Sequence, residues 1–127
     1  YLYVLFYMHK VEGKASMTIH PPWAPEGLEV GLFASRAPNR PNPIGLSIVA
    51  IERIDGNVIH TSGLDAFDGT PILDIKPYID GLDVREDANL GWVEGLPNAD
   101  HLALHIAGVP HGEDSEYEHR EGGPTDE

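Results

Sequence analysis

The sequence predicts a small all-β domain, either a barrel or a sandwich. Several short apolar segments are separated by loops that contain most of the chain's 11 prolines and 14 glycines, and these residues interrupt helices and end strands. No segment carries the apolar stripe with a period of 3.6 residues that is typical of an amphipathic helix. With 127 residues, the chain is long enough for one domain and too short for two ordinary ones.

The first third of the chain predicts two strands separated by a long loop. Residues 1–10 are aromatic and β-branched, as in a central strand, whereas residues 11–28 are polar and punctuated by Pro and Gly. Residues 29–35 form a second short apolar segment that we expect to be a strand. Residues 36–45 contain three prolines, two arginines and two asparagines, a composition that neither a helix nor a central strand tolerates.

The middle of the chain predicts a hairpin and a further strand. Residues 46–54 and 57–64 are apolar and flank an Asp-Gly pair at 55–56, which indicates a two-residue type I′ turn. Residues 72–79 form another short strand that Pro77 interrupts.

The end of the folded part is less regular. Residues 80–100 show no periodic pattern, and we expect Trp92 and Leu96 to anchor them to a core. Residues 101–106 alternate His and Ala with Leu and Ile, which fits a last strand and leaves a helical turn as the alternative.

The chain is strongly acidic, with 21 acidic and 8 basic residues and a net charge of −13. Residues 111–127 hold seven of these carboxylates and one arginine, which predicts an acidic disordered tail after a folded domain over residues 1–110. The acidity suits a cytoplasm of very high salt, where the Debye length is about 3 Å. An acidic mesophilic domain with an acidic tail explains it equally well. In either case the charge argues against unaided, charge-driven binding to nucleic acid or to an anionic membrane.

Several classes of site are absent from the sequence. Without cysteine, the chain has no disulfide scaffold, thiolate zinc site or cysteine nucleophile. No apolar run approaches the length of a membrane helix. His101 and His105 would lie about 13 Å apart in a strand, too far for one metal ion, so we expect no metal. Phosphate-loop, dinucleotide and nucleophile-elbow motifs are also missing.

The segment from residue 35 to residue 45 is a candidate binding loop. Its three prolines stiffen the backbone, so side chains that it presents lose little entropy on binding. Fork-shaped donors on a stiff loop suit a carboxylate, a phosphate or a purine edge. The alternative is a rigid turn whose arginines pair with surface carboxylates. The donors are Arg36, Asn39, Arg40 and Asn42.

A second candidate loop spans residues 65–71. Its Asp-Gly pair makes a tight turn, and Pro71 excludes a helix. Asp65 and Asp68 are able to accept hydrogen bonds from ribose hydroxyls or an ammonium group, and Phe67 is able to stack on a base. The alternative is that Asp68 only caps its own turn. The following strand places Asp74, Lys76 and Tyr78 on one face, where an Asp–Lys pair is either functional or purely structural.

Three blocks of this sequence resemble the TsaA-like (TrmO) family of methyltransferases. They are GLFASRAPNRPNPIGLS at 31–47, DGTPILDIKPY at 68–78 and LFYMHK at 5–10. Their order and spacing also agree with the family, and the resemblance covers about residues 1–80.

The resemblance implies a small single-sheeted β-barrel with long Pro/Gly-rich loops that binds S-adenosylmethionine. It further implies a cytoplasmic homodimer that N6-methylates threonylcarbamoyladenosine beside the anticodon of tRNA. The family's N-terminal strand would precede Tyr1, which agrees with the buried-strand character of residues 1–8 at the start of the sequence.

The resemblance also assigns roles to individual positions. The implied cofactor contacts are His9, Lys10, Arg36, Leu46, Asp65, Ala66, Phe67 and Asp68. The candidate substrate contacts are Arg40, Asn42 and Lys76. Removing a proton from the acceptor nitrogen calls for a base, for which the candidates are Asp68, Asp74 and Tyr78.

Two other functions remain open on the sequence. One keeps the methyl donor and changes the acceptor to a small molecule or a protein. The other is a non-catalytic module that binds an adenosine ligand on the same scaffold.

Overall fold

The computed structural model describes residues 1–21 and 24–96. The chain divides into two compact units, Tyr1–Glu86 and Asp87–Glu127. Residues 101–106, expected to be a last strand, and the expected tail at 111–127 lie outside the described residues.

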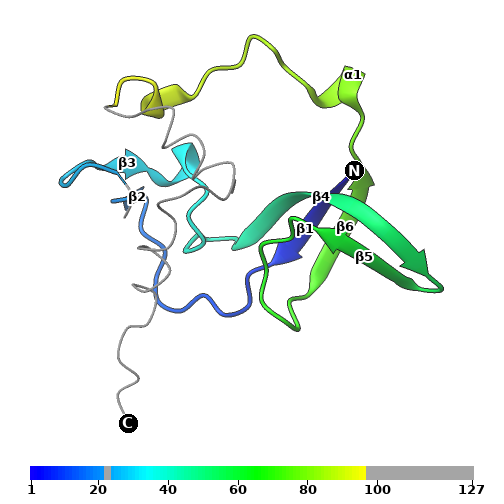
Figure 1. Ribbon diagram of the computed structural model, residues 1–127. Coiled ribbons are helices and arrows are strands. Elements are labelled where there is room, and N and C mark those ends of the chain that lie inside the picture. Colours follow the sequence, from blue (N-terminus) through cyan, green and yellow to red (C-terminus); the bar gives the residue numbers. More distant parts are fainter. Residues whose placement is uncertain (22–23, 97–127) are drawn as a thin grey trace. The chain divides into compact units, whose positions relative to one another are not determined.

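A four-stranded antiparallel sheet forms the centre of the first unit (Figure 1). Its first strand is central and pairs with the predicted strands of residues 46–54 and 72–79, which confirms the prediction for the start of the chain. In spatial order the strands are β5 (Val58–Ser62), β4 (Ile44–Asp55), β1 (Leu2–Tyr7) and β6 (Ile72–Pro77).

A second, two-stranded sheet contains β2 (Thr18–Ile19) and β3 (Val30–Gly31). The strand expected over residues 29–35 is therefore largely wrong, because a 3₁₀ turn, η1 (Leu32–Ala34), replaces most of it. The Leu32 side chain is fully buried, and its carbonyl accepts hydrogen bonds from the Ser35 backbone at 3.0 Å and the Ser35 hydroxyl at 2.7 Å. Such local bonding by a serine competes with strand pairing.

The predicted hairpin is present, with its turn one residue later than expected. Asp55 still pairs with Val58 in the β4–β5 ladder, so the two turn residues are Gly56 and Asn57. Gly56 has a φ of +57°, a left-handed conformation that this kind of hairpin turn requires and that glycine adopts without steric cost.

The region expected to be irregular contains two short helical turns. These are α1 (Asp80–Asp83) in the first unit and η2 (Gly91–Val93) in the second. Within the described part of the second unit, Val93 is the most buried side chain, with 1% exposed. Trp92 and Leu96, the expected anchors, are half-buried, and their anchoring role stays a prediction.

The core lies on one face of the four-stranded sheet. Its buried side chains are Val4, Phe6 and Val49. The loop of residues 63–71, named here the crossover loop, joins β5 at one edge of the sheet to β6 at the other. Ala66 in this loop packs against the core, so the connection itself covers the buried face.

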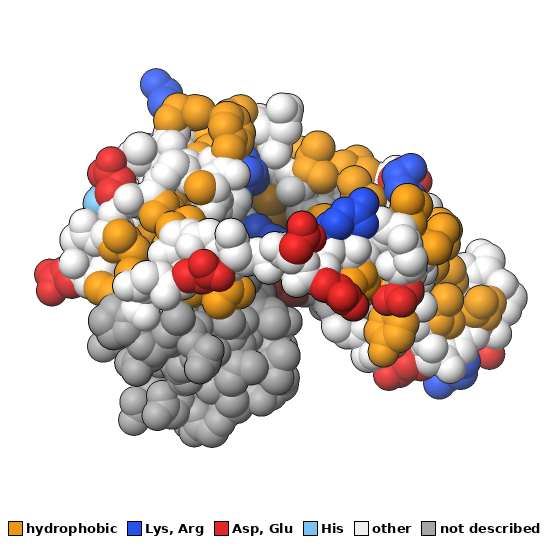
Figure 2. All heavy atoms as spheres, turned by 90° about the horizontal axis from the view of Figure 1, so that it is seen from above, with side chains coloured by type: hydrophobic (Ala, Val, Ile, Leu, Met, Phe, Trp, Pro, Cys, Tyr) orange, Lys and Arg blue, Asp and Glu red, His pale blue; other side chains and the backbone are white. Residues whose placement is uncertain are grey.

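The opposite sheet face is exposed, and it is apolar along β1 and β4. Cross-strand pairs place Tyr7 beside Ile44, Leu5 beside Leu46 and Tyr3 beside Ile48, and directly paired residues point to the same face. The side chains of the three β4 residues are about half exposed. Figure 2 shows hydrophobic side chains spread over the described surface between charged groups.

The all-β class is confirmed, since strands make up most of the regular structure in the described residues and the helical elements are single turns. Within these residues the four-stranded sheet is open, with β5 and β6 at its edges. Closure into a barrel therefore stays a prediction. No helix among the described residues is long and apolar enough to span a membrane.

The closest packing in the core joins Phe6 to Gly45. The two residues are cross-strand partners, and a Cβ atom at position 45 would lie 2.2 Å from a ring carbon of Phe6. Only glycine therefore fits at this position while the ring stays in place.

Gly45→Ala is expected to lower the free energy of unfolding by about 1–3 kcal/mol, because the added methyl group overpacks the core. Urea denaturation measures the change. Gly31→Ala is the matched control, since Gly31 has an ordinary extended backbone and open space around it. In a Gly45→Ala/Phe6→Leu double variant, part of the loss should be recovered; equal stability of wild type and Gly45→Ala would contradict the packing argument.

Candidate functional site

The C-terminal end of β1 holds both predicted binding loops. The Met8 backbone N–H donates to the Pro43 carbonyl at 2.8 Å, and the Tyr7 N–H donates to the Pro71 carbonyl at 2.9 Å. Residues 35–45, named here the proline-rich loop, and the crossover loop therefore meet at one end of the central strand. Two segments far apart in the sequence are thus brought to one place in the first unit.

Arg40 holds the start of the proline-rich loop in shape. Its Nη1 donates to the carbonyls of Leu32, Ser35 and Ala37 at 3.4, 2.9 and 3.2 Å. The guanidinium carbon also lies 5.8 Å from the centre of the Phe33 ring. The sequence left open a ligand or a surface carboxylate as its partner, and the structure shows backbone carbonyls instead. Substrate binding by Arg40 stays a prediction.

The other polar side chains of this loop differ in how they are engaged. Arg36 is exposed and has no hydrogen bond or ion pair to any residue that the structure describes. Asn39 donates through Nδ2 to the Lys14 carbonyl at 3.1 Å. Asn42 is exposed, and its backbone carbonyl accepts from the Ile44 N–H at 2.8 Å. Arg36 is therefore the side chain best placed to meet an anion.

Thr70 closes the turn of the crossover loop. Its hydroxyl donates to the Phe67 carbonyl at 2.6 Å, and its backbone N–H donates to the same oxygen at 3.2 Å. From the sequence, Asp68 was the candidate for this role, and Thr70, two residues later, was not anticipated. Asp65 and Asp68 are exposed, so both carboxylates are accessible to a ligand.

Lys10 and Phe67 join the first motif to the crossover loop. The Lys10 Nζ lies 5.0 Å from the centre of the Phe67 ring, a cation–π contact worth about 0.5–1 kcal/mol at an exposed site. The structure thus brings together two residues that the sequence assigned to one cofactor. His9 is exposed beside Lys10. The cofactor role of all three stays a prediction.

The sheet separates the remaining candidates into two groups. Leu46 pairs with Leu5, which also pairs with Asp74, so these side chains share the exposed face. Ala66 packs on the opposite, buried face. The Leu46 side chain and the Asp74 carboxylate consequently point away from the crossover loop and are not gathered with Asp68.

Asp74 is held as a carboxylate by its neighbours. The Lys76 Nζ lies 2.9 Å from its Oδ2, and the Ile75 N–H donates to its Oδ1 at 2.8 Å. The hydrogen bond from Lys76 comes first in lowering the pKa of Asp74 below its ordinary value, followed by the bond from Ile75. A carboxylate with a lowered pKa is a weaker base, which disfavours Asp74 among the candidate bases.

Tyr78 belongs to an aromatic group at the other end of β1. Its ring centre lies 6.5 Å from that of Tyr1 and 5.6 Å from that of Tyr3. Partial burial raises the pKa of Tyr3 above its ordinary value, and the negative charge of Asp83 and the nearby Tyr78 add to this. These contacts give Tyr78 a packing role, and its part in catalysis stays a prediction.

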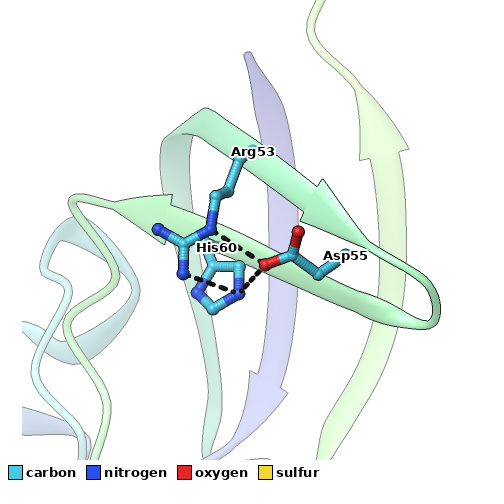
Figure 3. A network of polar contacts seen from close by, with 3 residues as sticks. All are labelled: Arg53, Asp55 and His60. Atoms are coloured by element: carbon cyan, nitrogen blue, oxygen red, sulfur yellow. Dashed lines mark hydrogen bonds and ion pairs between the residues drawn. The ribbon is translucent and has the colours of Figure 1, made fainter.

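One polar network was not anticipated from the sequence. In the β4–β5 hairpin, Asp55 Oδ2 lies 2.9 Å from Arg53 Nε and 3.0 Å from His60 Nε2 (Figure 3). Arg53 and His60 are cross-strand partners beside an irregularity in β4. The register of the predicted hairpin could therefore have indicated this network from the sequence. Both ends of the Arg53–Asp55 pair are more than half exposed, and such pairs contribute little stability.

No metal centre is found within residues 1–21 and 24–96, where no three potential ligands gather. His101 and His105 lie outside this part of the chain.

Comparison with known proteins identifies the class to which this fold and these loops belong. The family described as the tRNA-methyltransferase O N-terminal domain matches residues 1–84. A probable S-adenosyl-L-methionine-binding protein of Pyrococcus abyssi is 40% identical over 94 residues, covering 74% of this chain and 50% of that protein. The tRNA (adenine(37)-N6)-methyltransferase of Escherichia coli is 35% identical over 105 residues, covering 79% of this chain and 45% of that protein.

Solved structures agree with this classification. A crystal structure of TrmO is 39% identical and superposes with a TM-score of 0.57, covering 71% of this chain and 38% of that one. TrmO from Pseudomonas aeruginosa gives a TM-score of 0.55 at 36% identity, covering 72% and 36%. This chain belongs to the tRNA-methyltransferase O family, and it spans half or less of the length of these relatives.

Arg40→Ala is expected to lower the free energy of unfolding by about 1–3 kcal/mol, since it leaves partly buried carbonyls without a donor. Hydrogen exchange should also become faster at the backbone amides of residues 35–37. Arg36→Ala is the matched control and should leave both measurements unchanged. Similar exchange rates in wild type and Arg40→Ala would show that the guanidinium does not maintain the loop.

Lys76→Gln is expected to raise the pKa of Asp74 towards its ordinary value, as followed by carboxyl-carbon NMR. Because the folded-state pKa is lowered, ionised Asp74 stabilises the fold above the ordinary carboxyl pKa of about 3.9, and this is lost as the pH falls through the lowered value. The difference in stability between wild type and Lys76→Gln should therefore shrink below about pH 4. An unchanged pKa of Asp74 in Lys76→Gln would contradict the conclusion that Lys76 lowers it.

Proposed function

We propose that this chain binds S-adenosylmethionine and takes part in N6-methylation of adenosine in tRNA, at a threonylcarbamoylated adenosine beside the anticodon. The Lys10–Phe67 contact carries the proposal, because it joins the first motif to the crossover loop at the end of β1 where the proline-rich loop also ends. Membership of the family and the names of the similar proteins support the same function.

The side chains at this end of the sheet fit the chemical groups of the cofactor. Arg36 is exposed, pairs with none of residues 1–21 and 24–96, and provides a cation for the amino-acid carboxylate. Phe67 is 68% exposed and offers its ring to adenine. Asp65 and Asp68 are exposed acceptors for the ribose hydroxyls or the ammonium group. Charge, stacking and hydrogen-bonding partners are thus available within two neighbouring loops.

The chain's own contribution to methyl transfer would be mainly alignment. The cofactor supplies an already activated methyl group, so the protein has to hold the acceptor nitrogen in line and exclude water. The nitrogen also has to lose a proton. Asp68 is the better candidate for accepting it, because it lies in the crossover loop, whereas Asp74 is neutralised by Lys76 on the other sheet face.

A different methyl acceptor is the second candidate function. The net charge of −13 disfavours contact with phosphates over most of the surface, and it therefore favours a small-molecule or protein acceptor. A non-catalytic adenosine-binding module would share the cofactor contacts and lack transfer activity.

We further propose that the protein acts as a cytoplasmic homodimer and that its acidity reflects a cytoplasm of high salt. A tRNA substrate supports the cytoplasmic location. The exposed apolar face of Ile44, Leu46 and Ile48 supports association with a second copy. Light scattering in high salt should give twice the monomer mass, and a monomeric mass would reject the proposed dimer.

Arg36→Ala is expected to weaken binding of S-adenosylmethionine by about 10- to 100-fold, the range for losing one charge-assisted hydrogen bond. Calorimetric titration in low and in multimolar potassium chloride measures the dissociation constant. Arg85→Gln is the charge-matched control, because Arg85 lies outside both loops and donates to the nearby Leu82 and Val84 carbonyls. An unchanged constant for Arg36→Ala would remove Arg36 from the cofactor site.

Transfer of a labelled methyl group tests the acceptor. We expect label to enter tRNA that carries threonylcarbamoyladenosine, and not the same tRNA without this modification. Binding of S-adenosylmethionine without methyl transfer to any RNA would favour a small-molecule or protein acceptor. Absence of binding at both salt concentrations would reject the methyltransferase function for this chain.

A further inference from the structure

Two segments of the first unit lie side by side and form a continuous surface. Residues 8–17 are hydrogen-bonded to residues 32–43 at three points along their length. Met8 N–H donates to the Pro43 carbonyl at 2.8 Å, Asn39 Nδ2 donates to the Lys14 carbonyl at 3.1 Å, and Leu32 N–H donates to the Met17 carbonyl at 2.8 Å. We name these paired segments the basic ribbon.

The charge of the basic ribbon is opposite to that of the chain. It contains four cationic side chains and one carboxylate, Glu12, which gives a net charge of +3 within a chain of −13. The cations are Lys10, Lys14, Arg36 and Arg40. A polyanion approaching this acidic protein would therefore be attracted to the ribbon and repelled elsewhere.

The basic side chains outside the ribbon that the structure describes are already engaged. Arg53 and Lys76 are paired with aspartates, and Arg85 donates to two backbone carbonyls. Lys14 and Arg36, in contrast, form no ion pair with any residue of the described part of the chain, and both are exposed. Their charges are available to an external partner.

Exposed aromatic rings accompany these cations. Phe33 is 72% exposed and lies beside Arg40, and Phe67 is 68% exposed and lies beside Lys10. Phe67 belongs to the proposed cofactor site, whereas no ligand has yet been proposed for the Phe33 ring. Exposed rings next to cations are the arrangement by which proteins bind single-stranded nucleic acid, with bases stacked on the rings and phosphates held by the cations.

We propose that the basic ribbon binds a single-stranded loop of the RNA substrate, with Phe33 stacking on an unpaired base and Lys14 contacting a phosphate. This inference rests on the proposed function and adds to it the surface by which RNA is held beside the cofactor loops. It also explains how a strongly acidic chain accommodates RNA, because only a local positive surface is required.

The test compares Phe33→Ala and Lys14→Gln with two controls in the full chain. Arg85→Gln removes an equivalent charge outside the ribbon, and Leu82→Ala removes an apolar side chain that is 61% exposed in α1. The measurements are KM for a tRNA anticodon stem-loop in methyl transfer, the dissociation constant of that RNA by fluorescence anisotropy over a series of salt concentrations, and the calorimetric dissociation constant of S-adenosylmethionine.

Phe33→Ala is expected to weaken RNA binding and raise KM by about 5- to 150-fold, the range for one stacked base. Lys14→Gln should reduce the slope of log K against log salt concentration by about 0.7, the loss of one phosphate contact with a single strand. Cofactor affinity should stay the same in both variants, and the two controls should behave as wild type in every measurement.

Other outcomes would overturn the proposal in distinguishable ways. Unchanged KM and RNA affinity in both variants would reject the basic ribbon as an RNA surface while leaving the methyltransferase function intact. If the wild-type chain transfers no methyl group, fluorescence anisotropy still tests RNA binding directly. Failure of the wild-type chain to bind the stem-loop would reject the basic ribbon as an RNA-binding surface. Tighter binding to poly-glutamate than to RNA would assign the surface to an acidic protein partner instead.

Discussion

The contact between the Phe6 ring and Gly45 is the constraint on which the rest of the first unit depends. The ring occupies the space where any side chain at position 45 would begin, so it sets the pairing of β1 with β4. The same register also sets the positions of the residues that follow Phe6 in the chain. Met8 and Tyr7 bond to Pro43 and Pro71 immediately beyond it, and both candidate binding loops are thereby attached to the edge of the core.

Charge in this protein is organised locally. Arg53 and Lys76 on the sheet are paired with aspartates, and Arg85 after α1 donates to backbone carbonyls. Lys14 and Arg36 of the basic ribbon, in contrast, are exposed and form no ion pair with any residue that the structure describes. Net charge describes the long-range field of a protein, and salt screens that field over about 10 Å at 0.1 M. A short positive surface is therefore compatible with an acidic chain, especially in concentrated salt.

Much of the fold could be predicted because its signals are local. An Asp-Gly pair between apolar segments indicates a hairpin whatever surrounds it, and the prolines of residues 36–45 exclude a helix or central strand. The strand expected at 29–35 is limited to Val30–Gly31, because burial of Leu32 and hydrogen bonding by Ser35 favour a helical turn in the rest of that segment. Arg40 was expected to face a ligand or a carboxylate, and nothing in its neighbours indicated three carbonyl acceptors.

The sequence by itself determined the all-β class, the two loops that carry polar side chains, and the family whose motifs they contain, since each depends on residue type and short spacing. Only the tertiary structure decided which candidates meet. Lys10 reaches Phe67, while Leu46 and Asp74 share the sheet face opposite Ala66. The physical reason is that strand order and register set these distances, and a shift of one residue would move every side chain of a strand to the other face.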